Sequence, residues 1–119
     1  MKQTKQYDLE ERKAKFGQET IKFCKTIRQD VISKPIINQM VSSATNVGAN
    51  YMEANGISSK SDFRNKIHIS LKEARETRHW LKMLLTYFPG RKEKVKPLWI
   101  ENQELILFFS KISNTLSKK

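Results

Sequence analysis

Positively charged side chains recur at helical spacing between residues 60 and 82. On a wheel of 100° per residue they fall within roughly 40° of one line. This basic stripe consists of Lys60, Arg64, His68, Arg75, Arg78 and Lys82. The acids Glu73 and Glu76 point elsewhere on the same wheel. Because neighbouring like charges on a helix repel by about 0.2–0.5 kcal/mol per pair, the pattern predicts an anionic partner.

A rigid row of ammonium and guanidinium groups can follow the phosphates of a nucleic acid, and such contacts carry no sequence information by themselves. No aromatic residue interrupts the basic stripe, so the stripe itself provides no platform for stacked bases. The pattern therefore favours structured RNA or a duplex bound through its backbone. The alternative is that the stripe is an ordinary solvated surface.

A second polar pattern runs through residues 43 to 53. Ser43, Asn46, Asn50 and Glu53 share one side of a helix, while an apolar stripe that includes Met40 follows another. Amides beside a core stripe can fix the register of a bundle through hydrogen bonds, and breaking one costs about 1–3 kcal/mol. We therefore expect these four residues to have a structural role.

Catalytic and metal-binding patterns are weak in this sequence. Glu76 and His79 have the Glu-x-x-His spacing of di-iron bundles, but no second copy accompanies them. The sequence has neither a phosphate-cradling glycine loop nor a serine, histidine and acid arrangement that stands out. We expect no catalytic residue, metal, cofactor or small-molecule substrate, and a protein that is not an enzyme.

Composition limits the class of protein. The 119 residues suit one domain over residues 1–119, and 23 lysines and arginines against 12 acids give a formal charge of +11, which favours polyanionic partners. The single Cys24 cannot form an internal disulfide. The longest apolar run, 105–109, is far below the roughly 20 residues that cross a bilayer. We expect a soluble, cytoplasmic protein with no membrane partner.

Helical periodicity dominates four segments that turn-forming residues separate. We expect a first helix that Asp8 caps, a second over 33–55 with Pro35 in its first turn, a third over about 61–88, and a fourth that opens at Pro97 after the basic connector 91–96. Short connections between long helices favour antiparallel neighbours. The predicted fold is an all-α, antiparallel up-and-down four-helix bundle.

Apolar residues outside the main stripes point to self-association. They are Ile106 and Leu107 in the fourth segment and Ile69 and Trp80 in the third. A single bundle would expose them, and helices that are apolar on more than one side usually bury the second side against another surface. The alternative is a set of scattered exposed apolar residues.

The stretch S-S-A-T-N-V-G-A-N-Y-M-E-A from Ser42, together with S-K-S-D-F-R-N-K-I-H-I-S-L-K-E-A-R-E-T-R-H-W-L-K-M-L-L, resembles a known family. It is similar to the four-helix bundle proteins encoded in intervening sequences of bacterial large-subunit ribosomal RNA genes. The resemblance implies a bundle that assembles as a homopentamer and has a nucleic-acid role.

Together these patterns predict a non-enzymatic oligomeric bundle that binds RNA or DNA, with RNA favoured, through the basic stripe. The alternative function is a structural or protein-interaction adaptor with no direct nucleic-acid contact, whose cations meet an acidic protein surface. Salt titration discriminates the two, because counterion release makes nucleic-acid binding steeply dependent on salt.

Overall fold

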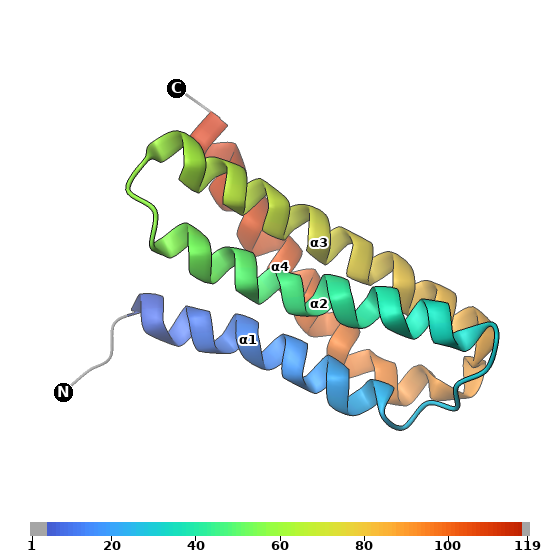
Figure 1. Cartoon of the computed structure of the whole chain (residues 1–119). Coiled ribbons are helices and arrows are strands. Elements are labelled where there is room, and N and C mark those ends of the chain that lie inside the picture. The colour runs from blue at the N-terminus through green and yellow to red at the C-terminus, as the bar shows by residue number, and fades with distance from the viewer. Residues whose placement is uncertain (1–4, 118–119) are drawn as a thin grey trace.

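The computed structural model describes the backbone of residues 5–117 and contains four α-helices and no strand over that range. The helices are α1 (Lys5–Cys24), α2 (Ser33–Asn55), α3 (Lys60–Tyr87) and α4 (Lys92–Ser117), and a 3-10 turn, η1 (Pro89–Arg91), joins α3 to α4 (Figure 1). The predicted all-α class with four helices is confirmed.

Connections alternate between the two ends of the molecule. Figure 1 shows the α1–α2 and α3–α4 connections at one end and the α2–α3 connection at the other. Each helix packs against the next one in the chain, and α4 also contacts α1. The described part of the chain contains no helix that is both long and apolar enough to span a membrane.

Helix α2 has the boundaries that its sequence predicts. Pro35 lies in the first turn, where a missing N–H has no intrahelical partner to lose. Ahead of the helix, the Asp30 carboxylate accepts the N–H groups of Ile32 and Ser33, each at 2.9 Å, and the Tyr87 hydroxyl at 2.7 Å. The N–H of Ser33, followed by the hydroxyl of Tyr87, lowers the pKa of Asp30 to about 2. Asp30 therefore ties the start of α2 to the end of α3.

Two predicted helix starts are wrong. Helix α1 already includes Lys5, so the backbone of Asp8 lies within the helix and not at its N-cap position. Helix α4 begins at Lys92, so the connector 91–96 is mostly helical and Pro97 lies within the helix. Burial explains the earlier start of α4. Val95 is only 1% exposed and lies one helical turn before the buried Leu98, so the apolar stripe of α4 starts before the proline.

The core forms between the four helices around the apolar stripes. In α2 the stripe Met40, Ala44, Val47 and Tyr51 is buried, as are Ile67, Ala74 and Leu81 in α3. Ser70 of α3 is also buried in this core, and its hydroxyl donates to the carbonyl oxygen of Val47 of α2 at 3.1 Å. Helices α2 and α3 are therefore held together by packing and by a buried hydrogen bond.

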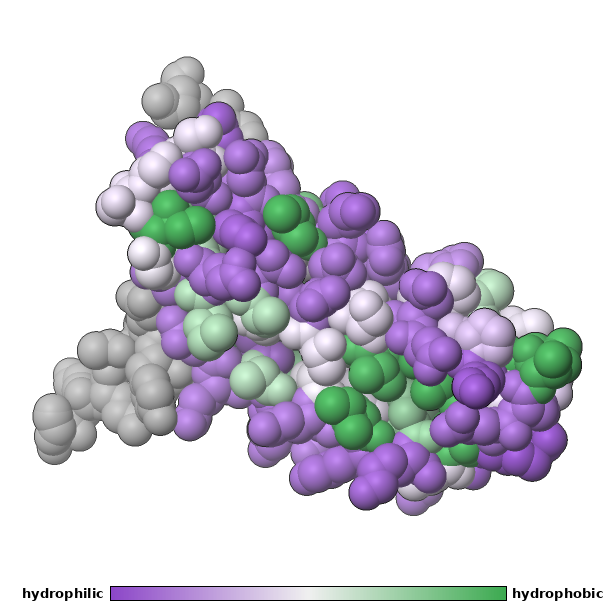
Figure 2. All heavy atoms as spheres, viewed as in Figure 1, coloured by the Kyte–Doolittle hydropathy of each residue, from purple (hydrophilic) through white to green (hydrophobic). Residues whose placement is uncertain are grey.

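Two of the four apolar residues expected to be exposed are not. Ile106 is 8% exposed and Trp80 packs partly buried against the core. The prediction failed because α4 packs on both α1 and α3, and α3 packs on both α2 and α4, which widens the arc that each helix buries. Leu107 and Ile69 are exposed. On the face in Figure 2, hydrophilic side chains separate the apolar groups, and the larger apolar groups lie over the half that holds the α1–α2 connection.

Candidate nucleic-acid interface

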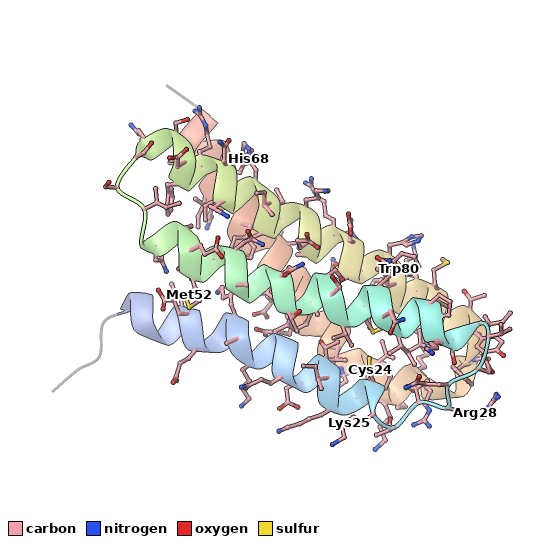
Figure 3. The ribbon with its side chains drawn as sticks, in the orientation of Figure 1. Cys24, Lys25, Arg28, Met52, His68 and Trp80 are labelled. Carbon is pink, nitrogen blue, oxygen red and sulfur yellow. The ribbon has the colours of Figure 1, made fainter. Side chains whose placement is uncertain are left out.

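The basic stripe of α3 lies along the junction between α3 and α4. Leu71, in the middle of the stripe, is buried, so the stripe borders the bundle. His68 and Arg75 line one pocket with residues of α4, and Lys82 lines a second pocket with the start of α4. Between the two pockets, Arg78 Nη1 donates to Gln103 Oε1 at 3.4 Å. Lys60 and Arg64 are exposed in the first turns of α3. Figure 3 places His68 near the start of α3 and Trp80 further along that helix.

Ion pairs distinguish the basic stripe from other cations of α3, although Glu93 lines the same pocket as Lys82. Among the residues that the structure describes, no member of the stripe forms an ion pair. Other cations of the same helix do: Lys66 lies 2.6 Å from Glu53, and Lys72 lies 4.0 Å from Glu76. Within α3, every lysine and arginine without a carboxylate partner thus belongs to the basic stripe.

The cations of the basic connector 91–96 lie on two different surfaces of the bundle. Lys92 and Lys96 line the second α3–α4 pocket beside Lys82. Lys94 faces the groove between α1 and α4, where Arg91 Nη2 donates to the carbonyl oxygen of Thr26 at 2.9 Å. Only part of the connector therefore extends the basic stripe.

An aromatic side chain does border the basic stripe, although α3 supplies none. Trp99 of α4 lines the pocket of 670 Å³ that also contains Lys82, Lys92 and Lys96, with apolar walls that include Met83 and Val95. The expectation concerned the stripe itself, and α3 places no aromatic residue within it. A wheel of a single helix cannot find this neighbour, because Trp99 lies on another helix.

The four polar residues of α2 have distinct contacts. The buried Ser43 hydroxyl lies 2.7 Å from the Thr77 hydroxyl of α3, and the Glu53 carboxylate binds Lys66 of α3. The Asn50 amide donates to the carbonyl oxygen of Asn46 at 2.9 Å, within α2 itself. Ser43 and Glu53 thus connect α2 to α3, while Asn46 and Asn50 contact each other within one helix.

Sequence reasoning missed the buried polar residue Asn102. Its amide group donates to the carbonyl oxygen of Ala74 at 2.9 Å and links α4 to α3, while Oδ1 has no partner among the described residues. Its helical spacing to Leu98 and Leu105 was the available signal. Within the same described range, no cluster of three or more histidine, cysteine or acidic side chains is arranged to hold a metal ion.

The fold and this surface define a class: small all-helical proteins with a basic face between their last two helices. Residues 5–110 match the sequence profile of the family described as 23S rRNA-intervening sequence protein. The chain belongs to that family, and the predicted resemblance is confirmed.

A solved structure supports this assignment. A crystal structure of a protein of unknown function from the S23 ribosomal protein family, from Bacteroides thetaiotaomicron, is similar to this chain with a TM-score of 0.81 and 26% sequence identity. The alignment covers 93% of this chain and 99% of that one. No curated protein matches the sequence.

Proposed function

We propose that this chain is a non-enzymatic, oligomeric protein that binds RNA or DNA, RNA above all, through the basic stripe of α3 and the adjoining surface of α4. In this proposal residues 1–119 form one antiparallel up-and-down bundle that acts in the cytoplasm. Support for the location comes from the cysteine count, because the single Cys24 cannot form an internal disulfide.

One observation carries the binding proposal. The cations of the basic stripe have no carboxylate partner among the described residues, whereas Lys66 of the same helix is paired. Unpaired charges on a rigid helix repel one another, and phosphates would relieve that repulsion. Phosphate contacts from α3 would position the nucleic acid, and Trp99 would offer a base-stacking surface at one end.

The test is a salt titration of nucleic-acid affinity for matched charge-removal variants. Each phosphate contact contributes about −0.9 to the log-log slope with duplex, so Arg75→Gln with Arg78→Gln should reduce the slope by about 2 and weaken binding at every salt concentration. The control, Lys25→Gln with Lys34→Gln, removes the same charge from exposed sites on other elements.

The control pair should leave the slope nearly unchanged above 0.1 M salt, where screening acts within about 10 Å. Equal losses of affinity in both double variants would show that the nucleic acid is attracted by the net charge of the protein and that the basic stripe is not a specific binding site. An unchanged slope in the arginine pair would remove the basic stripe from the interface.

One observation favours the alternative adaptor function. A groove of 640 Å³ between α1 and α4 has an apolar floor that includes Phe16, Phe23 and Leu98, and its rim mixes lysines with Glu19 and Glu101. A rim of mixed charge suits a protein surface better than a polyanion. Binding of a protein partner by the natural protein, without any nucleic-acid affinity, would favour this function.

A further inference from the structure

A polar pocket of 420 Å³ lies between α3 and α4, within the roughly 300–1,000 Å³ range of small-ligand sites. Two helices supply its lining. From α3 come His68, Leu71, Lys72 and Arg75, and from α4 come Ser110, Ser113 and Asn114. Leu71 is buried and is the one apolar residue of this lining.

The lining suits an anion. Hydroxyl, amide, ammonium, imidazole and guanidinium groups all donate hydrogen bonds, and no carboxylate lines the pocket. Within the described part of the chain, the side chains of His68, Arg75, Ser110, Ser113 and Asn114 have no hydrogen-bond or ion-pair partner. Their donors are therefore available to a ligand without breaking an internal contact.

We propose that this pocket binds a phosphoryl group. The planar guanidinium of Arg75 matches two phosphoryl oxygens, and donors from α4 approach the remaining oxygens from the opposite wall. Neutral hydroxyl and amide donors add directional contacts that a lone row of surface cations lacks. The pocket rests on the proposed function only where a nucleic acid supplies the phosphoryl group.

Electrostatics favour the anion on balance. The last turn of α4 carries about half a negative charge at its carbonyl end, which disfavours an anion near Asn114. Arg75 contributes a full positive charge from α3 that has no ion-pair partner among the described residues. Lys72 adds a second charge, which the Glu76 carboxylate at 4.0 Å partly compensates.

The first experiment titrates inorganic phosphate into the full-length protein and follows backbone amide shifts by NMR at constant ionic strength set with sodium chloride. The expected result is a saturable change confined to residues 68–75 and 110–114. Ser110→Ala with Ser113→Ala should raise the phosphate Kd at least about fivefold without changing the charge. The control, Ser42→Ala with Ser58→Ala, removes two exposed hydroxyls elsewhere and should leave the Kd unchanged.

Amide shifts that grow linearly without saturation, or a phosphate Kd that is the same in the Ser110 and Ser113 variant, would overturn the proposal that this pocket binds a phosphoryl group.

A second experiment measures the affinity of the same variants for oligonucleotides with a 5′-phosphate or a 5′-hydroxyl. Tighter binding of the 5′-phosphate assigns the pocket to chain ends, and equal binding that the serine variant weakens assigns it to the backbone.

The two proposals can fail separately. Saturable phosphate binding without nucleic-acid affinity would support the phosphoryl-binding pocket and refute the proposed nucleic-acid function. Nucleic-acid binding that depends on Arg78 and Lys82 but is insensitive to Ser110 and Ser113, in a protein that does not bind phosphate, would remove only the pocket.

Discussion

At the scale of single residues, Lys13 is a lysine placed inside the bundle. Its side chain is 2% exposed, and Nζ lies 3.9 Å from the ring centroid of Phe108 and 5.5 Å from that of Tyr51. Burial, aided by the charge of Arg12, lowers the pKa of Lys13 to about 8 from an ordinary 10.5. The aromatic rings offset part of the lost hydration, by about 0.5–2 kcal/mol.

The unfolded chain therefore holds the Lys13 proton more tightly than the folded chain does. The charged amine costs stability throughout the range below pH 8, and this cost disappears as the pH rises from about 8 toward 10.5. We expect Lys13→Met to be more stable than the natural protein by about 1 kcal/mol at pH 7 and to lose that advantage near pH 10.

Urea unfolding of the two proteins at pH 7 and pH 10 measures this difference. Taking the difference cancels every other group that titrates in the same range. Lys15→Met, an exposed neighbour on α1, is the matched control and should show no pH-dependent difference. A Lys13→Met protein that is less stable at both pH values would mean that the contacts with the rings outweigh dehydration.

At the scale of helices, Gly48 determines how closely α1 and α2 approach. A Cβ atom at position 48 would lie 3.0 Å from the carbonyl carbon and oxygen of Lys13, which belong to the α1 backbone and cannot turn aside. At Gly17 the nearest atoms, of Thr45, would lie 3.2 Å away and include a side-chain methyl. The α1–α2 contact thus depends on the absence of a side chain at Gly48.

We expect Gly48→Ala to destabilise the protein by about 1–2 kcal/mol. Overpacking costs about 1–3 kcal/mol, and the better helix propensity of alanine returns less than about 1 kcal/mol. Thermal unfolding followed by circular dichroism would measure the loss. Gly17→Ala should cost less, and Gly56→Ala, with its nearest contact at 3.7 Å, should cost nothing. If Gly48→Ala were more stable than the natural protein, α1 and α2 would be able to move apart at little cost in free energy.

At the scale of the whole molecule, exposed apolar side chains on α4 support self-association. Ile100 is 50% exposed and Leu107 is 69% exposed, and their spacing of seven residues places them on one side of the helix. A ring of copies would repeat each basic stripe and strengthen binding to a long polyanion through avidity. The homopentamer that the family resemblance implies is one such ring.

Light scattering at micromolar concentration should therefore give a mass several times that of one 14.0 kDa chain. Ile100→Glu with Leu107→Glu should reduce the mass toward a single copy, because two carboxylates cannot be buried in an apolar contact. Val31→Glu, which changes an exposed apolar residue in the α1–α2 connection, should leave the mass unchanged. A natural protein that scatters as a monomer would refute self-association.

Local patterns in the sequence predict the number of helices, the boundaries of α2, most of the buried stripes and the alignment of cations on α3. These properties follow from residues three and four positions apart, which lie next to one another on any helix. The predicted start of α4 at Pro97 is wrong because the buried Val95, which lies before the proline, already belongs to the helix.

The helix that lies beside the basic stripe, and the side chains that it adds there, follow from the assembly of the four helices. The pairing of Arg78 with Gln103, the approach of Trp99 to Lys82 and the pocket that Arg75 shares with Ser113 each join residues far apart in the chain. Helical period describes one helix at a time. The neighbour of a helix is selected by the packing of complete side-chain surfaces, and that packing exists only when all four helices are assembled.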